Sequence, residues 1–122
     1  MSTRAMIKFV DKDGTYKVYQ HMDGYPEGPH GILGLLQKVI ASGRAWELPR
    51  FEADEFAAAF VCVAKTSHGN VRLVNGGAWD VAYTYTVKAE GNELVVTWNG
   101  DSNGKATVSH DGIIPRFCRQ RT

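Results

Sequence analysis

The sequence predicts an α+β fold, in which an antiparallel β-sheet has two α-helices packed on one face. Runs with alternating apolar residues gather near both ends of the chain, and two runs with apolar residues at helical spacing lie between them. Strands and helices that segregate in this way are typical of the α+β class. The length of 122 residues, with 43% hydrophobic and 22% charged residues, is that of one globular domain. We therefore expect residues 1–122 to form a single domain with the element order β-β-α-α-β-β-β.

The first two strands form a predicted hairpin. Residues 5–10 alternate, and the polar turn "DKDG" follows them directly. Residues 16–20 then alternate again, so the two runs are expected to pair as antiparallel strands.

Two helices are predicted in the middle of the chain. The first follows from the helical spacing of Ile32, Leu35, Leu36, Val39 and Ile40, and Gly43 is placed to end it. The second is expected from about Glu52 to Thr66, with a buried stripe of Phe56, Ala59, Phe60 and Val63. We expect Cys62 to be buried beside that stripe as a small hydrophobic residue.

The last part of the chain is predicted to be β-structure. Its three strands are marked by alternating apolar residues at 81–87, 94–98 and 106–108. If Tyr83 and Tyr85 point into the core, Thr84 and Thr86 lie on a face that meets solvent or a partner chain, which allows a homodimer. Residues 116–122 are expected to be a frayed basic tail.

The charge and hydropathy of the chain exclude several classes of partner. A formal net charge of +1 gives no whole-molecule field toward nucleic acid or membranes, so we expect neither partner. The start of the chain has no apolar stretch of signal-peptide length, and no window approaches a membrane span. The sequence therefore predicts a cytoplasmic protein.

One segment, "HMDGYPEGPHG" at residues 21–31, is unusually rich in side chains that can do chemistry. Turn formation accounts for Asp23-Gly24 and for the prolines and glycines that follow. It does not account for His21, Tyr25, Glu27 and His30.

Four interpretations of this loop are open. The residues His21, Asp23, Glu27 and His30 include the usual ligands of a divalent metal, although their spacing matches no metal motif. Alternatively, His21 acts as a general acid or base oriented by Asp23 or Glu27. In the third interpretation, free N–H groups at the start of the following helix bind an anion together with His21, His30 or Arg4. In the fourth, the loop is only a rigid turn whose side chains bond its own backbone.

Two stretches of the chain, "MSTRAMIKF" and "YKVYQHMDGYPEG", resemble a family of small, mostly uncharacterised proteins that phages and prophages frequently encode. The likeness is carried by Thr3, Arg4, Tyr19, His21 and the run from Asp23 to Gly28. The later "GGAWDVAYTYTV" is similar to the second block of the family, and Met22 departs from an aromatic residue expected at its position. The resemblance implies a phage accessory protein that interferes with a host defence system or captures one of its signals.

The sequence is therefore interpreted as a binding protein rather than an enzyme. Its expected partner is a small anionic or nucleotide-like ligand, or a host protein. The residues expected to bind the ligand are Arg4, His21, Asp23, Tyr25, Glu27 and His30. No catalytic residue, metal or cofactor is assigned. The alternative is a small hydrolase or transferase that uses His21 with a neighbouring carboxylate.

Overall fold

The computed structural model describes residues 3–28, 30–67, 70–76 and 80–115. Two helices and seven strands follow one another along the chain. Their bounds are β1 Ala5–Asp11, β2 Gly14–Gln20, α1 Ile32–Ser42, α2 Ala53–Ser67, β3 Val71–Val74, β4 Tyr83–Glu90, β5 Glu93–Gly100, β6 Gly104–Ser109 and β7 Gly112–Pro115. The predicted α+β fold, with its hairpin and both helices, is confirmed.

The strands form a single sheet in the order β3-β2-β1-β4-β5-β6-β7. The prediction of a purely antiparallel sheet is wrong at one place, because β1 and β4 pair in parallel at the centre. A parallel pair needs a long crossover connection. Here the chain between β1 and β4 includes β2, both helices and β3, so β4 can enter the sheet beside β1 in the same direction.

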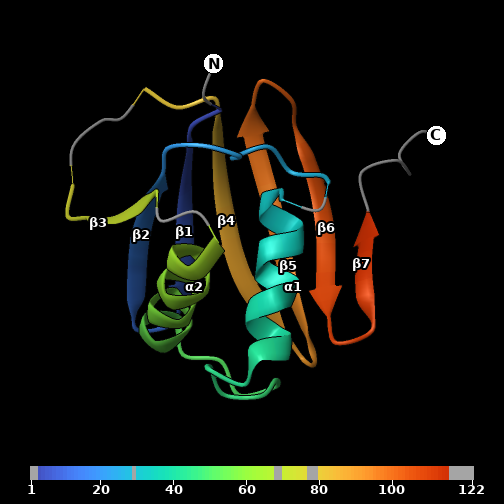
Figure 1. Ribbon diagram of the computed structural model, residues 1–122. Coiled ribbons are helices and arrows are strands. Elements are labelled where there is room, and N and C mark those ends of the chain that lie inside the picture. The colour runs from blue at the N-terminus through green and yellow to red at the C-terminus, as the bar shows by residue number, and fades with distance from the viewer. Residues whose placement is uncertain (1–2, 29, 68–69, 77–79, 116–122) are drawn as a thin grey trace.

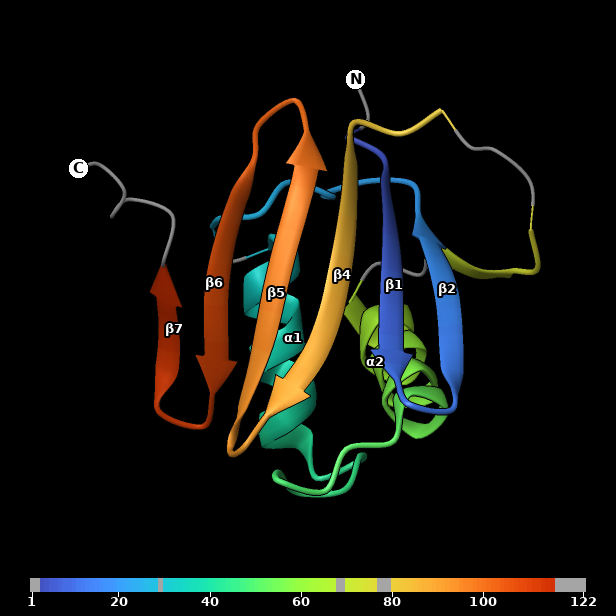
Figure 2. The same cartoon turned by 180° about the vertical axis from the view of Figure 1, so that it is seen from behind.

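Both helices cover one face of the sheet and leave the other uncovered (Figures 1 and 2). The core lies between the layers, where Phe9 of β1 packs on Phe56 and Phe60 of α2 with ring centroids 5.8 and 5.4 Å apart. Tyr85 is fully buried, as the inward orientation of the tyrosine strand predicts, and Tyr83 packs against the same core. The arrangement of two helices on one face is therefore confirmed.

The two helices bury the stripes that their sequences predict. In α1 the buried residues include Leu36 and Val39, and the helix ends at Gly43, whose φ of 73° is left-handed. In α2 the residues at 56, 59, 60 and 63 are buried. The prediction for Cys62 is wrong, since it is exposed on the outer side of the helix.

Two edge strands are absent from the predicted order. The strand β3 pairs with β2 at one edge, and β7 pairs with β6 at the other. Both expose apolar side chains, and Leu73 of β3 is 75% exposed. The predicted frayed tail at 116–122 lies outside the described residues.

Candidate functional site

The loop of residues 21–31 crosses one end of the sheet between β2 and α1 (Figure 1). Two fully buried side chains of the sheet donate hydrogen bonds to the backbone of this loop. The Gln20 amide donates hydrogen bonds to the carbonyl oxygens of Met22 at 2.8 Å and Asp23 at 3.2 Å. The Tyr85 hydroxyl donates to the carbonyl oxygen of Gly24 at 2.6 Å. The loop is therefore anchored to the sheet before any ligand is considered.

The centre of the loop has little room. Asp23 has a φ of 58°, a left-handed conformation that aspartate tolerates better than most residues. At Gly24 a Cβ would lie 2.7 Å from the Cβ of Ala5 and 2.8 Å from the carbonyl oxygen of Thr3. The close approach of the loop to Ala5 at the start of β1 thus requires a glycine at position 24.

The loop also caps the helix that follows it. The backbone N–H of Gly31 donates to Gly28, that of Ile32 to Tyr25 at 2.9 Å, and that of Leu33 to Pro26 at 3.2 Å. Because these N–H groups already bond loop carbonyls, the helix start has fewer of them to offer to an anion than the sequence suggested.

The histidine and the carboxylate of the loop have different partners. The Nδ1 atom of His21 lies 2.9 Å from the hydroxyl of Tyr19, which is on the preceding strand. The carboxylate of Asp23 instead accepts a hydrogen bond from the Tyr25 hydroxyl at 3.3 Å. Partial desolvation, and secondarily the charge of Asp23, raise the pKa of that phenol. The enzyme interpretation requires a carboxylate on His21, whereas the group on its Nδ1 is a tyrosine.

His21 lines a cavity of about 290 Å³ at the edge of the sheet, together with Lys65, Asn70, Val71 and Arg72. Three elements contribute to it, because Lys65 lies in the last turn of α2 and Arg72 lies on β3. The backbone N–H of His21 donates to the carbonyl oxygen of Asn70 at 2.9 Å, which ties the loop to the segment before β3. Among the residues that the structure describes, the lining contains a histidine, a lysine and an arginine but no carboxylate.

Arg4 belongs to the same end of the sheet. The β1–β2 register pairs Ala5 with Gln20, so Arg4 and His21 are the next positions in line beyond the paired residues. The backbone carbonyl of Arg4 accepts from Ala82 at 2.9 Å, and its side chain is exposed. The register thus places Arg4 near the His21 cavity, although it does not line it.

A second hollow, of about 500 Å³, lies at the other end of the loop. Residues 25–28 line it together with Tyr83, Trp98, Ser102 and Asn103. Its walls are aromatic and amide groups, and Glu27 is its carboxylate. The predicted ligand residues are therefore divided, with Arg4 and His21 on one side and Tyr25 and Glu27 on the other. Asp23 lies between them, and His30 lines neither cavity.

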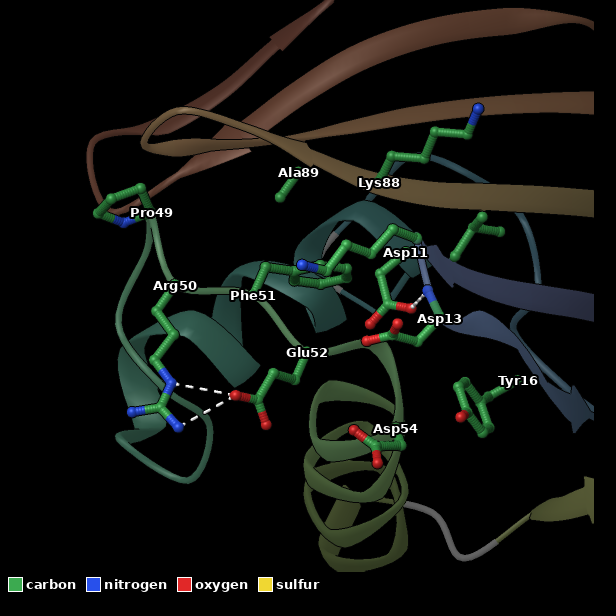
Figure 3. A pocket seen from close by; sticks show the side chains of 12 residues that line it. Asp11, Asp13, Tyr16, Pro49, Arg50, Phe51, Glu52, Asp54, Lys88 and Ala89 are labelled. Carbon is green, nitrogen blue, oxygen red and sulfur yellow. Dashed lines mark hydrogen bonds and ion pairs between the residues drawn. The ribbon is translucent and has the colours of Figure 1, made fainter.

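A larger hollow, of about 860 Å³, lies at the opposite end of the sheet and is rich in carboxylates (Figure 3). Two of these carboxylates already have structural partners. Asp11 accepts from three backbone N–H groups, and Glu52 forms an ion pair with Arg50 at 3.0 Å. Lys88 points away from the acidic groups. No group of three potential ligands in the described part of the chain could hold a metal ion.

Sequence reasoning found His21 but missed Lys65, Asn70 and Arg72. The cavity forms only when β3 pairs with β2, which places Arg72 opposite Tyr19. A short alternation in "NVRLV" was the available signal, and it says nothing of which strand lies beside it.

No protein-family model, curated protein or solved structure matches this chain. The likeness to phage-encoded proteins therefore stays a prediction. Within the described residues, no helix has the length and apolar character needed to cross a membrane.

Proposed function

We propose that this chain is a cytoplasmic binding protein of the phage-encoded type, and that it holds a small anionic ligand in the His21 cavity. The observation that carries the proposal is the convergence of His21, Lys65 and Arg72 on a cavity of about 290 Å³, whose described lining residues include no carboxylate. Such a lining favours a phosphate or a carboxylate group over a neutral or cationic ligand. The phage setting rests on the sequence resemblance alone.

The contacts of His21 explain how its ring would take part. When the Tyr19 hydroxyl donates to Nδ1, the ring proton is carried by Nε2, which becomes a donor for a ligand oxygen. The bond to Asn70 fixes the backbone of the same residue. Arg72 then supplies a planar pair of donors, and Lys65 supplies a second positive charge.

The test is a titration of the purified protein with inorganic phosphate and with adenosine monophosphate, followed by NMR and calorimetry. We expect His21→Ala and Arg72→Ala each to weaken binding by about tenfold or more, because a hydrogen bond to a charged group contributes about 1.5–3 kcal/mol. Arg4→Ala should have a smaller effect, since Arg4 lies beside the cavity rather than in its lining.

Arg44→Ala is the matched control, because Arg44 is an exposed arginine on the connection between the helices. The melting temperatures of all variants should stay close to that of the parent protein. The proposal fails if the parent binds neither probe, or if Arg44→Ala weakens binding as much as Arg72→Ala does.

A further inference from the structure

The uncovered face of the sheet has a charge distribution that the net charge of +1 conceals. Side chains alternate between the two faces of a strand, and residues paired across strands share a face. Because Tyr85 and Val87 are buried under the helices, their neighbours Thr84, Thr86 and Lys88 lie on the uncovered face. The strand registers then place five basic residues on that face, namely Lys8, Lys17, Arg72, Lys88 and Lys105.

The central row of this face crosses five strands. It consists of Lys17, Lys8, Thr86, Thr97 and Lys105, which are successive partners in the registers. Four inter-strand steps of about 4.8 Å make this row roughly 19 Å long. The row therefore presents lysines at both ends, a second lysine beside one of them, and hydroxyl groups in the middle.

The acidic residues of this face lie at one end of it and not in the central row. The carboxylates that the described strands place on the same face are Glu90 and Glu93, which are paired at the turn between β4 and β5. Among the described residues, no ion pair joins a carboxylate to any of the five basic side chains. Two of the lysines, Lys8 and Lys17, are direct cross-strand partners, an arrangement of like charges that destabilises a sheet.

The chemistry of the face favours a nucleic acid over a protein as the occupant. Protein interfaces are enriched in aromatic residues and depleted in lysine at their centre, and this row has the opposite composition. Lysine charges and threonine hydroxyls are instead suited to phosphate oxygens. A second copy of this chain would bring like charges together if the two faces met.

The same face favours a duplex over a single strand. Proteins that hold single strands use exposed aromatic rings on which the bases stack. Tyr19, the aromatic residue that the described strands place on this face, is only 6% exposed. A duplex hides its bases and carries about one phosphate charge per 1.7 Å of its axis, so a length equal to this row carries about eleven charges on its two strands.

We propose that the uncovered face binds the phosphate backbone of double-stranded DNA without sequence preference. The row of Lys17, Lys8, Thr86, Thr97 and Lys105 makes the central contacts, and Lys88 and Arg72 lie on either side of it. The proposal is independent of the small-ligand site except for Arg72, which borders both. It also revises the sequence-based expectation that nucleic acid is not a partner, which considered the net charge and not its placement.

The test is a fluorescence anisotropy titration of a labelled 20-base-pair duplex of mixed sequence over a series of salt concentrations. If each of the five basic residues neutralises one phosphate, the logarithm of the binding constant should fall with the logarithm of salt concentration with a slope of about −4.5. We expect Lys17→Glu and Lys105→Glu each to weaken binding about tenfold or more and to make the slope shallower. Phosphate binding in the His21 cavity should be retained in both variants, which separates this test from that of the proposed function.

Lys38→Glu is the matched control, because Lys38 is an exposed lysine of α1 and the substitution changes the net charge equally. It should leave most of the affinity intact. The proposal is overturned if the parent shows no binding at 25 mM salt, or if Lys38→Glu is as damaging as Lys17→Glu. It is also overturned if a single strand of the same length or an acidic polypeptide binds as tightly as the duplex.

Discussion

At the scale of single residues, Tyr85 is the side chain that ties the loop to the core. Its ring is fully buried between Tyr83 and Trp98, and burial raises the pKa of its phenol far above the usual range. The hydroxyl therefore stays protonated and donates to Gly24 at 2.6 Å. We expect Tyr85→Phe to lower the free energy of unfolding by about 1–3 kcal/mol, because the buried Gly24 carbonyl loses its donor.

Urea unfolding measures this loss, and hydrogen exchange should show faster exchange in the loop at residues 22–28. Tyr83→Phe makes the same chemical change on the neighbouring inward position, where the described structure records no hydroxyl hydrogen bond, and should cost less. Equal losses in the two variants would show that the Gly24 contact contributes nothing of its own.

At the scale of elements, Asp11 joins the first hairpin to the second helix. Its Oδ2 atom accepts from the backbone N–H of Ala53 at 2.8 Å, and its Oδ1 atom accepts from Asp13 and Gly14. These bonds, with that of Ala53 the largest contribution, lower the pKa of the carboxyl below its usual value of 3.8. A carboxylate whose pKa is lowered on folding stabilises the fold above its unfolded pKa, and this contribution is lost as the pH falls through the folded pKa.

We therefore expect Asp11→Asn to be less stable than the parent at neutral pH, with a difference that narrows once the pH falls below about 3.8. Thermal unfolding at a series of pH values measures it. Asp13→Asn is the control, since the described structure shows no hydrogen bond to the Asp13 carboxylate. A difference between Asp11→Asn and the parent that stays constant down to pH 2 would contradict the assignment of the effect to this charge.

The elements also show what the sequence can and cannot predict. Both helices were predictable because each carries an apolar stripe, such as Phe56 and Phe60 in α2, that needs no knowledge of its partner. The strand β3 was predictable only in part, because the alternation of Val71 and Leu73 indicates a short extended segment but does not show that this segment pairs with β2. The parallel pairing of β1 with β4 depends on where the crossover returns, which no local pattern records.

The residues of the candidate site also differ in whether the sequence could predict them. His21 stood out because turn chemistry does not explain a histidine there. Its neighbours Lys65 and Arg72 looked like ordinary surface charges, since only the β2–β3 pairing and the end of α2 bring them to one cavity. A site assembled from three separate elements leaves no signature in any one of them.

At the scale of the whole molecule, the placement of charge conflicts with the stability of the sheet. Lys8 and Lys17 are direct cross-strand partners on the uncovered face, and both side chains are partly buried. Like charges in this position are destabilising, whereas an opposite pair contributes roughly 0.2–1 kcal/mol. A sequence selected for stability alone would place a glutamate at one of these positions.

Lys17→Glu should therefore raise the free energy of unfolding by about 0.2–1 kcal/mol, because it converts a repulsive pair into an attractive one. Urea unfolding at low salt measures the gain, and high salt should shrink it. Lys38→Glu on α1 provides the control for net charge and should bring no comparable gain. If Lys17→Glu is more stable yet binds duplex DNA more weakly, the lysine pair is maintained at a cost in stability, as expected for a binding surface. A loss of stability in this variant would instead show that the two lysines contribute to the sheet through their aliphatic stems.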